Sequence, residues 1–211
     1  MNQERPWILQ GNSGSGVKIG YGSITPDYGW HDMVGNVTVR FAGATAPALA
    51  VYRGGIQQYQ FAVNDECFNE FHILHDYAPG SHLYLHTHWS HIATTVTGGS
   101  VTWGFEVTYA KGHNQAAFAA PVTRTVVGNA STTQYQHIIT ETQISAASPD
   151  ATQIDSDDIQ VDGILLIRTY LSANNITVSG GGVPDPFLHF TDIHYQSTAM
   201  PTKNKAPSFY I

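Results

Sequence analysis

Charged residues are scarce in this chain of 211 residues, and their scarcity excludes several classes of protein. Asp, Glu, Lys and Arg make up 12% of the sequence, about half of the share in a typical globular domain. The net charge is -7, and no run of Lys or Arg occurs. Because phosphate binding requires a basic face, we expect nucleic acid not to be a partner. A surface so poor in charge favours a protein that packs against copies of itself or against a partner.

Cysteine and long apolar runs are also lacking. Cys67 is the single cysteine, so no disulfide can form within the chain, and we expect Cys67 to fill the core. The opening residues contain no apolar signal region, and no stretch reaches the length of a membrane span. We therefore expect no membrane partner.

Hydrophobic residues also lack the period of about 3.6 that is typical of helices, whereas apolar and polar residues often alternate with the period of two that is typical of strands. Val, Ile, Thr and aromatic residues dominate short runs that Gly, Pro, Asn and Asp separate. The expected strands are 36–41, 49–62, 67–76, 81–92, 100–110, 122–128, 133–145, 159–173 and 186–197. This pattern predicts an all-β fold, a two-sheet antiparallel β-sandwich of jelly-roll type.

Two segments outside the strands are poor in core-forming residues. Residues 1–30 are rich in Gly and Ser, and this composition predicts an extended N-terminal arm. We expect residues 31–198 to form the sandwich domain and residues 199–211 to form an extended C-terminal tail. Apolar residues at the tip of the arm would dock on a neighbour, and those at the tip of the tail would dock either on a neighbour or on their own domain. These partner-binding candidates are Trp7, Ile8, Leu9, Phe209, Tyr210 and Ile211.

Residues 82–91 carry four of the eleven histidines. In a strand, His82, His86 and His88 lie on one face, and imidazoles at positions i and i+2 are about 6–7 Å apart. The sequence thus offers a candidate site for a divalent metal at these three histidines, which His72, His189 or His194 from neighbouring strands would complete. The alternative is that they only form hydrogen bonds between strands, so that the protein has no cofactor.

The spacing Gly80-x5-His86-x-His88, followed by Gly99, resembles the first motif of the cupin family, in which histidines and a glutamate hold a metal inside a jelly roll. The resemblance implies a metal-dependent enzyme centred on His86 and His88. However, Ile92 stands where the family has glutamate, and no second cupin motif follows.

Five phrases of the sequence resemble a family of virion structural proteins of tailed bacteriophages. They are residues 50–55 (AVYRGG), 75–80 (HDYAPG), 86–91 (HTHWSH), 109–114 (YAKGHN) and 192–198 (DIHYQST). The resemblance implies a structural component of the virion, assembled in the host cytoplasm, and not an enzyme.

Within that family we favour a capsid decoration (cement) protein. It would be a homo-oligomer, with a trimer expected, and it would bridge and stabilise the capsomers of the major capsid protein. The alternative is a tail fibre, collar or host-recognition module that contacts neighbouring tail proteins. In that case Trp30, Trp89 and Trp103 are candidates for stacking on sugars.

Overall fold

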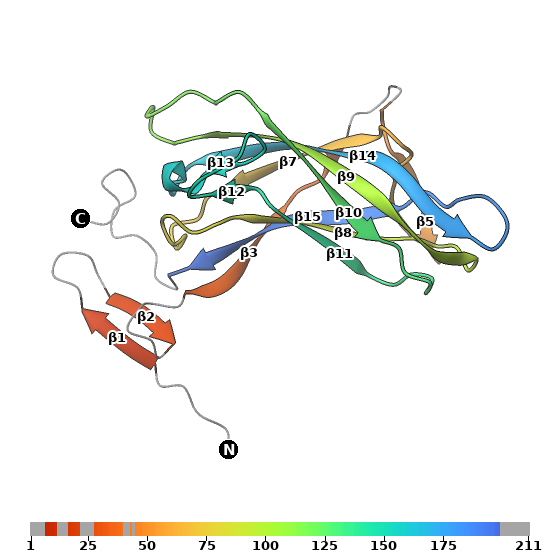
Figure 1. Cartoon of the computed structure of the whole chain (residues 1–211), viewed down its shortest axis with the longest axis horizontal. Helices are drawn as coiled ribbons and strands as arrows, with labels where there is room; N and C mark the ends of the chain where they lie inside the picture. The colour runs from red at the N-terminus through yellow and green to blue at the C-terminus, as the bar shows by residue number, and fades with distance from the viewer. Residues whose placement is uncertain (1–6, 12–16, 22–27, 40–42, 44, 199–211) are drawn as a thin grey trace, which may run out of the picture.

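The computed structural model describes residues 28–39, 43 and 45–198, together with the backbone of residues 7–11 and 17–21. Within these ranges the chain is almost entirely β, and two large antiparallel sheets pack face to face (Figure 1). The helical content described is one 3-10 turn, η1 (Ser156–Asp158). No helix in the described ranges is long and apolar enough to cross a membrane.

The first sheet has five strands. Its order is β10 (Val122–Asn129), β9 (Val96–Ala110), β14 (Ile164–Val178), β7 (Glu66–His72) and β4 (Thr38–Val39). Strands β9 and β14 each have 15 residues and pair along their whole length, with register shifts after Leu171 and Thr177.

The second sheet has six strands. Its order is β11 (Ile138–Gln143), β8 (Tyr84–Ser90), β15 (Phe187–Ser197), β6 (Ile56–Gln60) and β5 (Ala48–Arg53), while β3 (Gly29–Gly35) pairs with the C-terminal part of β15. A parallel pair of short strands, β12 (Ser145–Ala146) and β13 (Ile154–Asp155), completes the sandwich domain.

The strand order is that of a jelly roll, which confirms the predicted fold class. In chain order, β6, β8, β11 and β15 belong to one sheet, and β7, β9, β10 and β14 belong to the other. Successive strands therefore cross repeatedly between the sheets, as two Greek keys require.

The core lies between the two sheets, where side chains from alternate positions interdigitate. Trp89 from β8 and Trp103 from β9 are both fully buried, with ring centroids 6.5 Å apart across the sandwich. Cys67 is also fully buried, as expected. Because Trp89 and Trp103 belong to the core, the idea that they stack on sugars is wrong, and Trp30, half-exposed on β3, is the one of the three that a ligand can reach.

The predicted arm contains regular structure. Strands β1 (Trp7–Gly11) and β2 (Val17–Tyr21) form a separate antiparallel pair, with Trp7 opposite Tyr21. The sandwich begins with β3 at Gly29, close to the predicted boundary.

Two further elements differ from the sequence-based expectation. The sequence pattern predicts no strand over residues 29–35, where the structure has β3. The predicted strand 49–62 is a hairpin of β5 and β6, in which Gly54 adopts a left-handed φ of 59° at the turn.

Candidate functional site

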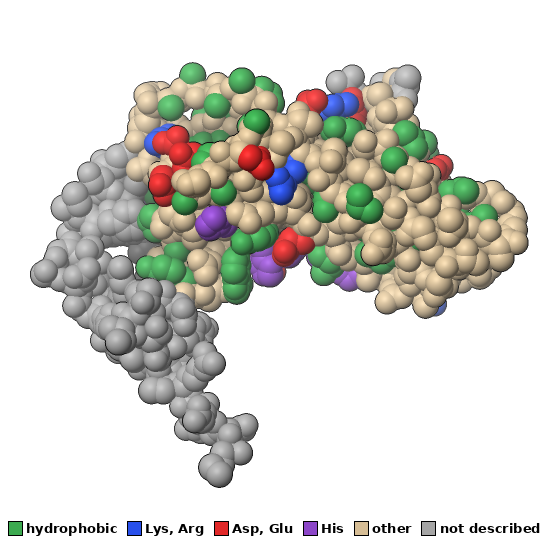
Figure 2. Space-filling model, in the orientation of Figure 1, with side chains coloured by type: hydrophobic (Ala, Val, Ile, Leu, Met, Phe, Trp, Pro, Cys, Tyr) green, Lys and Arg blue, Asp and Glu red, His purple; other side chains and the backbone are tan. Residues whose placement is uncertain are grey.

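A group of buried polar side chains lies on the outer face of the six-stranded sheet. On β8, Leu85 and Trp89 face the core, so His86, His88 and Ser90 face away from it. Neighbouring strands and the segment before β11 add further imidazoles and carboxylates. We call this group the histidine cluster, and its members are His86, His88, His137, Glu141, His189, Asp192 and His194. Figure 2 shows histidine side chains gathered along the lower flank of the molecule, where β8, β11 and β15 run.

A β-bulge in β15 brings Asp192 into the histidine cluster. Leu188 pairs with Trp89, but the next paired residue of β15 is Phe190, opposite His88, so His189 is inserted in the strand. The extra residue reverses the alternation. Leu188 therefore faces the core, whereas Asp192, four positions later, faces outward opposite His86.

Asp192 is the point at which the two histidines of β8 converge. Its Oδ1 atom is 2.9 Å from His88 Nε2 and 3.4 Å from His86 Nδ1. All three residues are buried, with relative exposures of 4% for Asp192, 7% for His86 and 6% for His88. Their three nearest donor atoms lie within 4.8 Å of one another, which is close enough to hold one metal ion.

The second ring nitrogen of each histidine also has a partner. His86 Nε2 donates to Glu141 Oε2 over 2.8 Å, and His88 Nδ1 shares a hydrogen bond of 2.8 Å with His137 Nε2. Each imidazole is therefore held at both nitrogens, and its orientation is fixed before any ligand binds.

A second group that could hold a metal overlaps the first. It consists of His86, Glu141 and His194, whose donor atoms also lie within 4.8 Å of one another. This group is more open, because the Glu141 side chain is 54% exposed, and His194 Nε2 already pairs with Asp32 Oδ1 at 3.1 Å. The group around Asp192 is the better enclosed of the two.

The charges within the histidine cluster are unevenly distributed. The hydrogen bond with Asp192 raises the pKa of His86 above its usual value, against the effect of burial, and the bond with Glu141 adds to this. Burial alone would raise the pKa of Asp192, but the hydrogen bonds and charges of His86 and His88 lower it overall. Asp192 is therefore an anion at neutral pH.

The outer members of the histidine cluster behave differently. Burial, together with the charges of His137 and His88, lowers the pKa of His189 to about 4. Burial and the charge of His88 also lower the pKa of His137. Both imidazoles are therefore neutral at pH 7, and neutral imidazole is the form that binds a metal.

Aromatic rings hold the histidine cluster in place. The ring of Phe190 stacks on His88 with centroids 4.0 Å apart, and His194 packs edge-on against His86 at 4.7 Å. At the far end, Ser90 Oγ donates to the Tyr52 hydroxyl over 2.9 Å. At the opposite end, the ring of Trp30 packs against the rings of Tyr84 and His194. The outer sheet face is thus a packed layer of rings.

The structure places the three histidines of the sequence hypothesis at two locations. His86 and His88 lie in the histidine cluster, whereas His82 precedes β8 and its Nδ1 is 3.1 Å from the Ser145 carbonyl oxygen. Among the neighbours considered from the sequence, His189 and His194 join the histidine cluster and His72 does not. Asp192, Glu141 and His137 were missed. The sequence does contain a signal for Asp192. Ile193 and Tyr195 belong to the core, so in an alternating strand Asp192 and His194 face outward together.

The partner-binding candidates predicted from the sequence lie in the arm and in the tail. Trp7, Ile8 and Leu9 lie in β1, of which the structure describes the backbone only. Phe209, Tyr210 and Ile211 lie outside the described residues.

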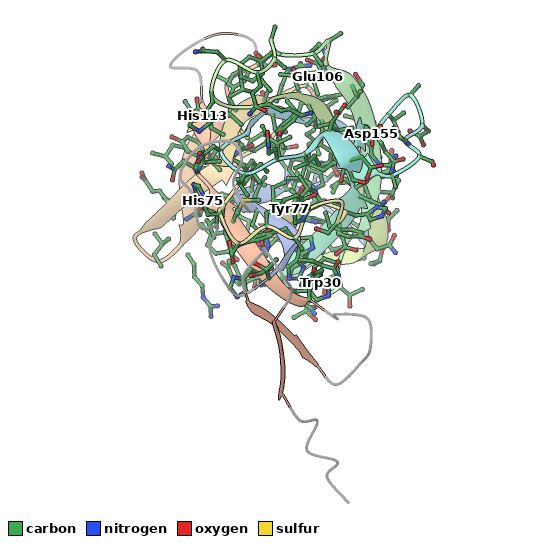
Figure 3. All side chains as sticks on the ribbon, turned by 90° about the vertical axis from the view of Figure 1, so that its left-hand side faces the viewer. Trp30, His75, Tyr77, Glu106, His113 and Asp155 are labelled. Carbon is green, nitrogen blue, oxygen red and sulfur yellow. The ribbon has the colours of Figure 1, made fainter. Side chains whose placement is uncertain are left out.

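A separate group of histidines surrounds Asp162. His75 Nε2 is 2.9 Å and His72 Nε2 is 3.2 Å from Asp162 Oδ1, and His113 Nε2 is 2.8 Å from Oδ2. Figure 3 shows His75 and His113 on the same side of the sandwich. The three rings share one carboxylate as hydrogen-bond acceptor, and His72 and His113 are well exposed.

Two shallow hollows occur elsewhere, on the five-stranded sheet. One, of about 290 Å³, has Phe68, Leu166 and Arg168 in its lining, and the other, of about 310 Å³, includes Phe71 and His72. His86 and His88 line neither of them. The chain matches no protein-family model and no curated protein sequence.

Proposed function

We propose that this protein is a structural subunit of a tailed-bacteriophage virion, and that it acts as a capsid decoration protein. It assembles with copies of itself, as a trimer, and bridges neighbouring copies of the major capsid protein. The phrases that resemble virion structural proteins motivate the proposal, and the jelly-roll sandwich is a fold common among capsid proteins.

The observation that carries the proposal is the exposed apolar β5 edge of the six-stranded sheet, as seen among the residues that the structure describes. Strand β5 is the last strand of that sheet in the part of the chain that the structure describes. Leu49 and Val51 on β5 are 56% and 58% exposed, and Ile56 on β6 is 59% exposed.

Free edges are usually protected by charges, proline or a covering segment, because exposed strand edges pair with other chains. Residues 48–60 contain Arg53 as their one charged residue. An apolar, nearly uncharged edge of this kind favours a subunit whose edge is covered by a neighbouring molecule.

The test is to find the protein on the particle. Purified virions of the phage that encodes the chain are probed with a gold-labelled antibody against it, and their proteins are quantified by mass spectrometry. Label over the head, with many copies per particle, supports a decoration protein. Label on the tail moves the subunit to the tail fibre or collar, and absence from virions overturns the proposal.

A metal-dependent enzyme is the second candidate, and the convergence of His86, His88 and Asp192 favours it. Three protein ligands with an open position are typical of catalytic metal sites. Because these imidazoles face away from the core, such an enzyme would bind its substrate on the outer sheet face. Turnover of a substrate that is lost in His88→Ala would support this candidate.

A further inference from the structure

We propose that His86 Nδ1, His88 Nε2 and Asp192 Oδ1 bind one divalent transition-metal ion of the zinc type per chain. The proposal does not depend on where the protein acts. It rests on the arrangement of three buried residues from two neighbouring strands of the same molecule.

The spacing of the donor atoms fits such an ion. Metal–nitrogen and metal–oxygen bonds of about 2.0–2.1 Å place tetrahedral ligand atoms about 3.4 Å apart and octahedral ones about 3.0 Å apart. The Asp192 Oδ1 atom lies 3.4 Å from His86 Nδ1 and 2.9 Å from His88 Nε2. Both distances are close to these values, so small side-chain movements would complete the site.

The remaining nitrogens are held as they are in known metal sites. A metal-binding histidine usually bonds through its other nitrogen to a carboxylate or another fixed acceptor. Glu141 Oε2 does this for His86, and His137 Nε2 does it for His88, each over 2.8 Å. Phe190 restricts the His88 ring further by stacking on it. Two orienting partners on the correct atoms are the strongest argument for a binding site rather than a simple hydrogen-bond network.

The donor set selects the type of ion. Two imidazoles and one carboxylate suit zinc and related borderline ions, whereas calcium and magnesium require mostly oxygen ligands. The three ligands leave a further coordination position for water or for a group of a partner molecule. The ion would also link β8 to β15 on the outer face of the sheet.

Asp162 provides an internal comparison. Its three histidines each direct a nitrogen at the same carboxylate, but His72 is 53% and His113 is 37% exposed, in contrast to the buried histidines at Asp192. A substitution at His113 therefore tests whether any bound ion belongs to this second group.

The experiment uses the full chain, freed of metal with a chelator and then titrated with Zn²⁺ against a chromophoric competitor. We expect one Zn²⁺ per chain, with binding at least tenfold weaker in Asp192→Asn and in His86→Ala. Asp192→Asn keeps the shape of the side chain, and circular dichroism checks that each variant folds. His113→Ala and His82→Ala are the matched controls and should bind as the original chain does.

Titration with Co²⁺ gives a second readout, because the visible absorption of the ion reports nitrogen and oxygen coordination. The Co²⁺ spectrum of the original chain should be lost in His88→Ala and retained in His113→Ala. Absence of binding overturns the proposal, as does binding that survives Asp192→Asn. Binding that is lost in His113→Ala alone would place the ion at Asp162 and would also overturn it.

Discussion

Asp192 stands directly opposite His86 in the register of β8 and β15, yet its closer bond is the diagonal one to His88, at 2.9 Å against 3.4 Å. One carboxylate thereby connects two histidines that alternate along a neighbouring strand. Diagonal and direct cross-strand pairs both stabilise a sheet. Asp192 therefore joins His86 and His88 at the centre of the histidine cluster.

Replacing Asp192 by Ala should lower the free energy of unfolding by about 2 kcal/mol, because two buried imidazoles lose a charged hydrogen-bond partner. Urea denaturation measures the change. Asp158→Ala is the matched control: the Asp158 side chain is 67% exposed and pairs with Lys111 at the surface, so the loss should stay within about 0.5 kcal/mol. Equal losses in both variants would contradict the central position of Asp192.

A lysine at position 49 should prevent association through the edge of β5. Leu49 is 56% exposed, so Leu49→Lys should change the free energy of unfolding by no more than about 0.5 kcal/mol while placing a charge on the apolar edge. Light scattering after size exclusion compares the oligomeric state with that of Val127→Lys, which adds the same charge on β10 at a residue 60% exposed. If both variants assemble normally, the edge of β5 is not an interface.

Stability below about pH 5 should depend on Asp162. Burial opposes ionisation, but the hydrogen bond of His113 and the charge of His75 hold the pKa of Asp162 below its usual value of 3.8. The stability that Asp162 contributes is therefore present above pH 3.8 and is lost as the pH falls through the lower pKa of the folded state.

The variant Asp162→Asn isolates this effect. Asparagine tolerates the positive φ of 60° at this position and cannot ionise. Between about pH 5 and pH 2, the original chain should lose stability more steeply than the variant. Urea denaturation at four pH values gives the two slopes, and identical slopes would exclude Asp162 as the source.

The thiol of Cys67 should be inert in the folded protein. Burial, with a smaller effect of the charge of Glu66, raises the pKa of Cys67 to about 12, so almost no thiolate exists at pH 8. Iodoacetamide at pH 8 should leave the native protein unlabelled and should modify it fully in urea, as mass spectrometry reads directly. Because Cys67 is the single cysteine, any native labelling would show that the core opens there.

If the protein decorates virions as proposed, deleting residues 1–25 should weaken that binding and leave the sandwich folded. The deletion ends before β3, which starts at Gly29 and pairs with β15. Co-sedimentation with particles that lack the protein measures binding, and circular dichroism checks the fold. Unchanged occupancy would show that the arm makes no essential contact.

The sequence predicts the sandwich well because its strands follow a local rule. Alternation in β8 correctly places Leu85 and Trp89 in the core and His86 and His88 together on the opposite face. The same rule fails in β15, where inserted His189 reverses the alternation. Counting from Leu188 would place Asp192 in the core.

Other parts of the site depend on contacts between distant segments. Glu141 reaches His86 because β11 pairs with β8, 55 residues away in the chain. Strand β3 has glycine at both ends and only one β-branched residue, Val34, so its conformation depends on pairing with β15. Such pairings cannot be derived from local patterns.

The pairing of Gly29 with Ser197 has a mechanical consequence. These residues begin β3 and end β15, so the segments that lead to the arm and the tail leave the sandwich side by side. Force that pulled these two segments apart would load the hydrogen bonds of this antiparallel pair one after another, because those bonds lie across the strands. The domain would then unfold at low force, starting from the end of the sheet where Gly29 pairs with Ser197. A neighbour that held both segments together would instead spread the load over the whole sheet.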